Sequence, residues 1–199
     1  MNDLFSSHNP WELFEQWLLL AKATPDITEP TAMSLATCNA RGEPSVRIVL
    51  LKEIDERGFV FYTNYESRKS RELIENPHAA LCFYWMKLDR QIRIRGAVER
   101  IAPEQSDAYF SSRGREKQIG ACTSKQSQPL AAREQFEQEI HAMTLRFESE
   151  DTITRPETWG GWRIVPQEIE FWIQQPYRLH ERRQFLREGD GWQSQLLYP

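Results

Sequence analysis

The sequence is poor in cysteine and in long apolar runs, and each shortage excludes a class of protein. Its three cysteines, Cys38, Cys82 and Cys122, are far apart and form no CxxC pair. They predict free thiols in a cytoplasmic protein and argue against a disulfide framework or a zinc site. No run approaches the roughly 20 apolar residues that a membrane span needs, and residues 1–17 lack the features of a signal peptide.

Neither sign of charge is in large excess. The formal net charge is −4, so we expect no general attraction to nucleic acid or to an anionic membrane, and any anion site must be local. The sequence lacks the motifs GxGxxG, GxxxxGKS/T, GxSxG and HExxH, which carry nucleotide binding and hydrolysis. Its four histidines share no metal-ligand spacing, so we predict no metal site.

The overall composition is typical of a soluble globular protein. Hydrophobic residues make up 40% of the chain and charged residues 27%. The length of 199 residues suits one domain and no low-complexity linker interrupts it, so we predict a single domain over residues 1–199. Asn9 and Pro10 form a helix start, and apolar residues at helical spacing then predict an amphipathic helix over residues 10–23.

Stretches rich in β-branched and aromatic residues alternate with turn residues between residues 32 and 199. They predict about six short antiparallel strands, among them a hairpin built from residues 45–54 and 58–64. Helices are expected around residues 103–112 and 130–148. Together these elements predict an α+β fold, in which a small antiparallel barrel carries peripheral helices.

Basic residues stand near both ends of the strand predicted over residues 45–54. Arg47 and Lys52 would lie on the order of 16 Å apart along an extended strand and would have opposite parity. They therefore suit two anions at opposite ends of an elongated site better than one small anion. The alternative is that both side chains lie at strand ends in solvent.

A second basic pair, Arg68 and Lys69, follows Ser67 at the start of a short predicted helix. Free N–H groups and the positive end of the helix dipole favour an anion at this point. The two cations oppose the dipole, and an anion would compensate their charge. The alternative is a solvated first turn in which these charges pair with Glu72 or Glu75.

The stretch "RLHER" places Arg178, His180 and Arg182 two residues apart. On a strand all three side chains would point from one face, which could meet an anionic or aromatic ligand. The alternative is a charged surface segment with a structural histidine.

The stretch "YFSSRGREKQIG" places Tyr109, Arg113 and Lys117 four residues apart, as on one face of a helix. Gly114 is expected to break such a helix, so an ordinary surface helix is the alternative.

Several of these stretches together resemble the pyridoxamine/pyridoxine 5′-phosphate oxidases, the FMN-dependent split-barrel family. The resemblance runs from about Pro30 to Pro199 in the family's order. It is carried by the strand led by Gln91 and by "RIVLLK" (47–52), "FYTNYESRK" (61–69), "YFSSRGREKQIG" (109–120), "SKQS" (124–127), "WGG" (159–161) and "EFW…RLHER" (170–182).

The resemblance implies an antiparallel split β-barrel that forms a homodimer with FMN at the subunit interface. It implies oxidation of pyridoxamine 5′-phosphate or pyridoxine 5′-phosphate to pyridoxal 5′-phosphate, with O₂ reduced to H₂O₂. Two phosphorylated ligands would explain why the chain needs two clusters of cations, because a buried phosphate requires charged partners.

The resemblance also assigns residues by position. Those implied to bind FMN are Arg47, Ile48, Val49, Leu50, Leu51, Lys52, Tyr62, Thr63, Arg68, Lys69, Gln91, Gln126, Ser127, Trp172 and Arg182. Those implied to bind the substrate are Lys52, Tyr109, Arg113, Lys117, Arg178 and His180. Arg178 and His180 would be the catalytic pair, because they would contact the pyridine part of the substrate.

Three positions depart from the family pattern. Lys117 stands where a serine is usual, Gly114 where a proline is common, and Glu181 where an aspartate is common. Few residues precede the first helix, whereas many members carry an arm there that covers the substrate. These departures leave two alternatives open, a related oxidase that acts on another substrate, such as the phenazine-pathway relatives, and a non-catalytic protein that binds a flavin or pyridoxal phosphate.

Overall fold

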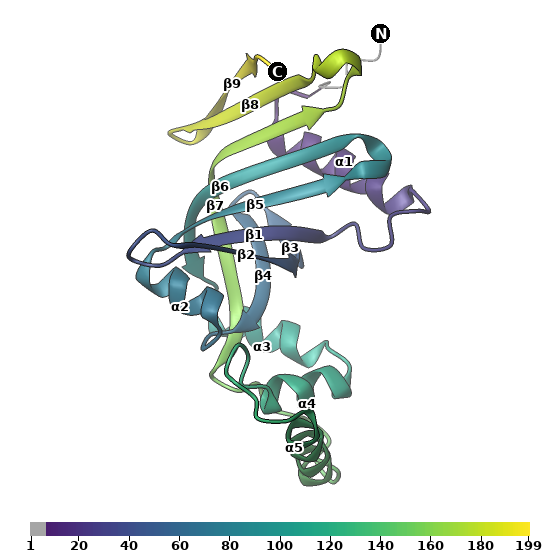
Figure 1. Ribbon diagram of the computed structural model, residues 1–199, viewed down its shortest axis with the longest axis vertical. Helices are drawn as coiled ribbons and strands as arrows, with labels where there is room; N and C mark the ends of the chain where they lie inside the picture. Colours follow the sequence, from purple (N-terminus) through teal and green to yellow (C-terminus); the bar gives the residue numbers. More distant parts are fainter. Residues whose placement is uncertain (1–6) are drawn as a thin grey trace.

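The computed structural model describes residues 7–199 (Figure 1). The helices are α1 (Pro10–Ala23), α2 (Arg68–Glu75), α3 (Pro103–Ser111), α4 (Arg115–Thr123) and α5 (Arg133–Arg146), with short 3₁₀ turns η1 (Met86–Leu88) and η2 (Pro176–Arg178). The strands are β1 (Ala32–Cys38), β2 (Pro44–Leu50), β3 (Glu53–Asp55), β4 (Gly58–Asn64), β5 (His78–Trp85), β6 (Arg90–Arg100), β7 (Trp159–Ile173), β8 (Glu181–Glu188) and β9 (Gly191–Leu197).

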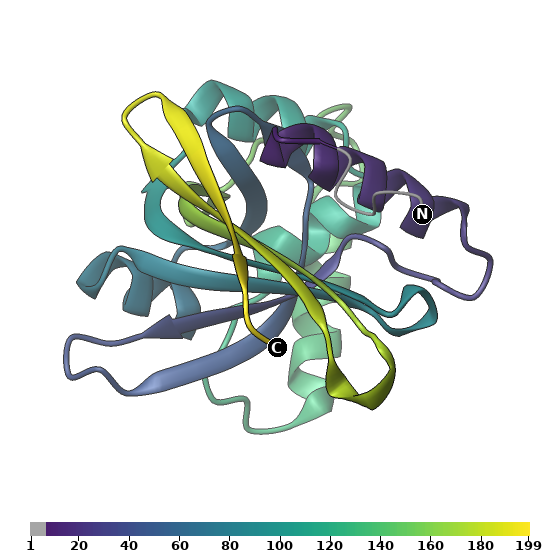
Figure 2. The same cartoon turned by 90° about the horizontal axis from the view of Figure 1, so that it is seen from above.

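One nine-stranded sheet forms the body of the molecule. Its main order is β2-β1-β5-β6-β7-β4-β3, and β8 and β9 continue from β7. The 15-residue β7 makes this branching possible. Its first part pairs with β4, its last part pairs with β8, and β6 runs along both parts. The result is an antiparallel sheet that curls into an open barrel, and the β8–β9 hairpin crosses above the other strands (Figure 2). The predicted α+β class with peripheral helices is confirmed.

The main core lies between the sheet and α1. Asn9 caps this helix by accepting a hydrogen bond from the backbone of Trp11, and Pro10 follows at the first position. The buried face of α1 then brings Phe14 within 5.0 Å of the Phe59 ring and Trp17 within 5.2 Å of the Phe171 ring, both edge to face. Full burial of one such ring stabilises the fold by about 2–3 kcal/mol. The bounds predicted for this helix are confirmed.

A second, smaller core lies beneath the barrel, where α3, α4 and α5 gather at the end of the molecule opposite the β8–β9 hairpin (Figure 1). Its buried residues are Phe110, Ile119, Phe147, Ile153 and Trp159. Gly114 occupies the N-cap of α4, so the break predicted there separates two helices. The helix α4 itself was not predicted.

Two predicted strands are wrong in detail. The strand expected over residues 45–54 is interrupted, because β2 ends at Leu50 and Lys52 donates its backbone N–H to Val60 instead. The "RLHER" stretch is not one strand either. Arg178 closes the turn η2 with φ of +63°, and β8 begins only at Glu181. The sheet also has nine strands, more than the six expected.

All three cysteines are free thiols. Within residues 7–199, none of the helices has both the length and the apolar character needed to cross a membrane.

Candidate functional site

A cavity of about 840 Å³ opens between the barrel and the helices beneath it. Strands β2 and β4 form one wall, and α2, α3 and α4 contribute the others. The lining residues include fourteen of those predicted to bind cofactor or substrate, namely Arg47, Ile48, Val49, Leu50, Lys52, Tyr62, Thr63, Arg68, Lys69, Tyr109, Arg113, Lys117, Gln126 and Ser127.

This lining is strongly cationic. Among the described residues it contains no aspartate or glutamate, and its charged members are Arg47, Lys52, Arg68, Lys69, Arg113 and Lys117. Arg47 and Lys52 line the same cavity, although β2 ends at Leu50 and the two residues do not share one continuous strand. Such a concentration of like charge favours a ligand that carries at least one multiply charged anion.

Two of the cations share one buried carboxylate. Glu72, in α2, accepts hydrogen bonds from Arg68 Nε at 2.8 Å and from the Nη2 atom of Arg47 at 3.3 Å. Although burial opposes ionisation, hydrogen bonds from hydroxyl groups and from Arg68 lower the pKa of Glu72 to about 2. The predicted pairing of Arg68 with Glu72 therefore exists, but Glu72 is buried beneath the cavity and is not part of a solvated turn.

Within residues 7–199, the hydrogen-bond partners of the Lys69 ammonium group are all neutral. Its Nζ lies 3.1 Å from both Thr63 Oγ1 and Gln126 Oε1 and 3.3 Å from Ser67 Oγ. Burial, reinforced by the nearby charge of Arg47, lowers the pKa of Lys69 to about 8. An anion in the cavity would supply the opposite charge that this ammonium group lacks.

An aromatic stack forms another part of the wall. Tyr62 is sandwiched between Tyr109, at 4.0 Å between ring centroids, and Trp159, at 5.3 Å. The hydroxyl of Tyr62 donates to Glu53, and burial together with this bond raises the pKa of Tyr62 well above its usual value. Arg113 lies over the Trp159 ring at 4.7 Å.

Arg113 also provides the most direct sign of a missing ligand. Its Nη1 atom is buried and has no hydrogen-bond partner among residues 7–199. A buried guanidinium nitrogen without an acceptor is costly, so the geometry calls for an oxygen ligand at this point.

The remaining predicted residues form a second group on the outer part of the sheet. Gln91 pairs with Trp172, and Trp172 pairs with Arg182, so the three lie in one row across β6, β7 and β8. The His180 ring packs on Trp172 at 4.6 Å, and Arg178 lies in the adjacent turn η2. We call Gln91, Trp172, Arg178, His180 and Arg182 the row group.

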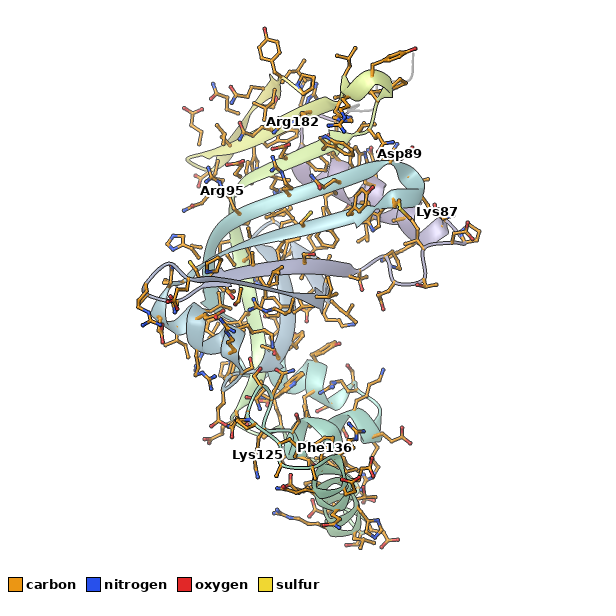
Figure 3. All side chains as sticks on the ribbon, viewed as in Figure 1. Lys87, Asp89, Arg95, Lys125, Phe136 and Arg182 are labelled. Carbon is orange, nitrogen blue, oxygen red and sulfur yellow. The ribbon has the colours of Figure 1, made fainter. Side chains whose placement is uncertain are left out.

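The row group does not line the cavity. Figure 3 labels Arg182 on the part of the sheet far from α5, whereas Lys125 and Phe136 are labelled at the α5 end. Buried Glu170 holds Arg182 by accepting from its Nε at 2.9 Å, and it also binds Arg93. The predicted site therefore divides into two parts within one chain.

One residue of the predicted FMN-binding stretch is not among those that line the cavity, and other residues near the cavity were not predicted. Leu51 is buried in the main core and does not reach the cavity. Trp159, Glu53 and Glu72 were not among the predicted site residues. The "WGG" stretch contained a signal for Trp159, since it begins β7 directly beside the cavity.

Comparison with known proteins identifies the fold and the family. The chain is 30% identical to PhzG from Burkholderia lata, solved with tetrahydrophenazine-1-carboxylic acid, with a TM-score of 0.92 and coverage of 100% of this chain and 97% of that one. It superposes with a TM-score of 0.76, at 17% identity, on an FMN-binding protein of Nostoc punctiforme related to pyridoxamine 5′-phosphate oxidase, covering 97% of this chain and 100% of that one. The fold is therefore that of the FMN-binding split barrels.

Sequence comparison is more specific. The family model "Pyridoxamine 5'-phosphate oxidase" matches residues 19–147, and "Pyridoxine 5'-phosphate oxidase C-terminal dimerisation region" matches residues 159–199. A pyridoxine/pyridoxamine 5′-phosphate oxidase of Gluconobacter oxydans is 50% identical over 96% of this chain and 94% of that protein. One from Bartonella henselae is 47% identical over 100% of this chain and 96% of that protein. The chain belongs to the pyridoxamine 5′-phosphate oxidase family, whose members are FMN-dependent oxidoreductases.

Proposed function

We propose that the protein oxidises pyridoxamine 5′-phosphate or pyridoxine 5′-phosphate to pyridoxal 5′-phosphate, using FMN as cofactor and O₂ as electron acceptor. The observation that carries this proposal is the single cavity whose described lining has six cations and no carboxylate. Two phosphorylated ligands would bring about four negative charges, which such a lining can neutralise. Full-length relatives at about 50% identity with this named activity support the same choice.

The FMN phosphate is assigned to the end of the cavity formed by β2 and α2. Arg47, Arg68 and Lys69 supply the positive charge there, and Lys69 already lies within hydrogen-bond distance of Gln126. The other residues proposed to line the flavin from this side are Ile48, Val49, Leu50, Tyr62, Thr63 and Ser127.

The substrate phosphate is assigned to the end formed by α3, α4 and Lys52. Arg113 would give its unpartnered Nη1 atom to a phosphate oxygen, and Lys117 would add a second charge. Tyr109 lies at the same end, where its hydroxyl is a further donor.

The row group is proposed to reach the cavity of a second copy of the chain in a homodimer. A symmetric pair would exchange this group reciprocally, so that each cavity is completed by the other subunit. Gln91, Trp172 and Arg182 would then contact FMN. Both matched regions contribute strands to one sheet, so we further propose that residues 1–199 act as one domain.

FMN, when bound, would supply the two-electron acceptor for oxidation at C4′ of the substrate, with O₂ as the final acceptor and H₂O₂ as its product. The protein's own contribution is to hold two anions and two rings in register. His180 accepts a hydrogen bond at Nδ1 from the backbone of Gln175 at 3.2 Å. In the neutral ring Nε2 therefore carries the proton and can donate to the substrate. Arg178 would orient the substrate and stabilise charge on its pyridine ring.

A direct assay tests the proposal. The purified protein should show an FMN absorption spectrum and, with pyridoxamine 5′-phosphate under air, should form pyridoxal 5′-phosphate and H₂O₂. A protein that cannot take up FMN would contradict every flavin function. A protein that binds FMN without turnover would contradict the oxidase activity and leave a flavin-binding role.

A phenazine-type oxidase is the second candidate, because PhzG has nearly the same fold at 30% identity and because Lys117 replaces a usual serine. The same assay with a reduced phenazine carboxylate in place of pyridoxamine 5′-phosphate separates the two. Preference for the phenazine would favour this candidate over the B6 vitamer oxidase.

The role of the row group can be tested by Arg178→Ala. The side chain is exposed and lies in the turn η2, so the fold and FMN binding should be unaffected. The rate constant kcat should fall by about two orders of magnitude, because a charge at the reacting ring is lost. Steady-state kinetics together with the flavin spectrum measure both effects, and full activity would remove the assigned role.

A further inference from the structure

The buried carboxylate of Glu72 is the most heavily hydrogen-bonded acidic group next to the cavity. Its side chain, only 6% exposed, accepts from Thr37 Oγ1 and Ser45 Oγ, both at 2.5 Å, as well as from Arg47 and Arg68. It lies behind the guanidinium groups and does not line the cavity itself. A carboxylate in this place reduces the net charge available to an anionic ligand, so its presence requires another explanation.

The two arginines bound to Glu72 differ in the number of N–H donors that remain for a ligand. A guanidinium has five N–H donors. In Arg47 the Nη1 atom bonds to Leu35 O and Thr37 Oγ1, and the Nη2 atom bonds to Ser45 Oγ and Glu72. These bonds leave only the Nε donor of Arg47 for a ligand.

Arg68 has the opposite arrangement. Its Nε atom is bound to Glu72 at 2.8 Å. Residues 7–199 provide no hydrogen-bond partner for its Nη1 and Nη2 atoms, so four N–H donors remain for an anion. Since an exposed arginine has many rotamers, the bond to a buried, fixed carboxylate restricts the direction of these donors. The side chain of Arg68 is 61% exposed, and this ion pair is what anchors it.

We propose that Glu72 is a positioning residue for the cofactor phosphate. Glu72 fixes Arg68 so that the Nη1 and Nη2 donors of Arg68 point to the phosphate. It also holds Arg47 beside the phosphate as a fixed charge, most of whose donors are already bonded. This inference rests on the proposed function, because it takes the ligand at this end of the cavity to be the FMN phosphate. Preorganised cations bind an anion more tightly than flexible ones, since less side-chain entropy is lost on binding.

The variant Glu72→Gln separates positioning from simple charge. If Glu72 acted only as a negative charge near the phosphate, its removal would tighten FMN binding. If it positions the arginines, the loss of a charged acceptor should raise the Kd for FMN by about 30-fold. Riboflavin lacks the phosphate, so its Kd should change less than about twofold. Fluorescence titration of the apoprotein with each flavin measures both constants.

Two further variants complete the experiment. Glu75→Gln removes the same charge from an exposed position on the same helix, where Glu75 accepts a hydrogen bond from the backbone of Ala40, and it should leave both constants unchanged. Thr37→Val keeps the shape of a buried side chain but removes the hydroxyl that links Glu72 with Arg47. It should weaken FMN selectively by about fivefold, and it provides a readout if Glu72→Gln does not fold.

The outcomes are distinct. Equal or tighter FMN binding by Glu72→Gln, or equal weakening of FMN and riboflavin, would overturn the positioning role. A wild-type protein that binds riboflavin as tightly as FMN would contradict the proposed phosphate site itself, and the inference with it.

Discussion

At the scale of single residues, Lys69 shows that a buried charge suited to an anion lowers the stability of the protein without a ligand. The folded pKa of about 8 lies below the ordinary value of 10.5, so the unfolded chain binds more protons between these two values. The free energy of unfolding should therefore rise with pH across this window and be lowest below pH 8, where Lys69 is charged in both states.

Lys69→Met tests this sign. The variant apoprotein should be more stable than wild type at pH 7, and the difference should shrink toward pH 9.5, because wild type then loses the buried charge. The affinity for FMN should depend on pH in the opposite sense to the stability. It should fall above pH 8 in the wild type and show no such fall in the variant. Urea unfolding and FMN titration at both pH values provide the measurements. A stability difference that does not depend on pH would contradict the assignment.

Lys117 is the residue that departs most clearly from the family pattern, and it lines the cavity. Lys117→Ser should raise KM for pyridoxamine 5′-phosphate by about tenfold, because one charged contact to phosphate is lost. It should leave kcat nearly unchanged, since the contact is the same before and during reaction. Steady-state kinetics provide the test, and Lys87→Ser, outside the cavity lining, is the control. A fall in kcat at constant KM would show that Lys117 acts on the chemistry instead.

At the scale of elements, the contact between β6 and β7 leaves no room for a side chain at one point. A Cβ on Gly96 would overlap the carbonyl oxygen of Val165, beside the register shift between the two strands. Gly96→Ala should therefore lower the free energy of unfolding by about 2–4 kcal/mol. In contrast, Gly120→Ala, in α4 with open space around it, should raise it by about 0.5–1 kcal/mol. Urea denaturation measures both, and similar values for the two would contradict the steric argument.

The elements that sequence patterns predicted well are those whose signals are local. Helix α1 has a capping residue, a proline and regular apolar spacing, and its bounds were confirmed. The break after Leu50 has no such signal. Residues 45–54 are mostly apolar. Leu51 still bonds to Thr31 beside β1, and the pairing changes at Lys52, which bonds to Val60 of β4 instead. For the same reason the interruption between Arg47 and Lys52 could not be predicted from alternation.

The "RLHER" stretch failed for a different reason. Period-two spacing holds only along a continuous strand, and here Tyr177 and Arg178 both have φ near +60°. Such values are rare outside glycine and asparagine and are not visible in composition. The charged residues of the cavity were found from their positions and spacing, whereas the neutral residues such as Thr63 and Gln126 could be named only because the family resemblance placed them.

At the scale of the whole molecule, the two parts of the site must come from different subunits if the proposed dimer is correct. Co-expression of Arg113→Ala chains with Arg178→Ala chains tests this. Half of the dimers formed at random are mixed, and each mixed dimer has one intact site of two, so about a quarter of wild-type activity should return. Each variant alone should be nearly inactive. Turnover per bound flavin in the mixture is the measurement.

Absence of recovery, with mixed dimers demonstrated by differential tags, would contradict a shared site. The sequence alone does not separate the row group from the cavity residues, because it does not show which strands are neighbours in the sheet. Their separation became visible only when the register of β6, β7 and β8 was known.

Strand β7 begins at Trp159 in the cavity wall and reaches Trp172 in the row group. In a reciprocal dimer, β7 would therefore set the distance between two centres, the cavity of its own chain and the cavity of the partner that its row group reaches. No hinge or linker within β7 would compensate for a change in its length. One residue inserted into β7 would change the distance between the two centres. The same insertion at Gly189, in the distant β8–β9 turn, would leave this distance unchanged.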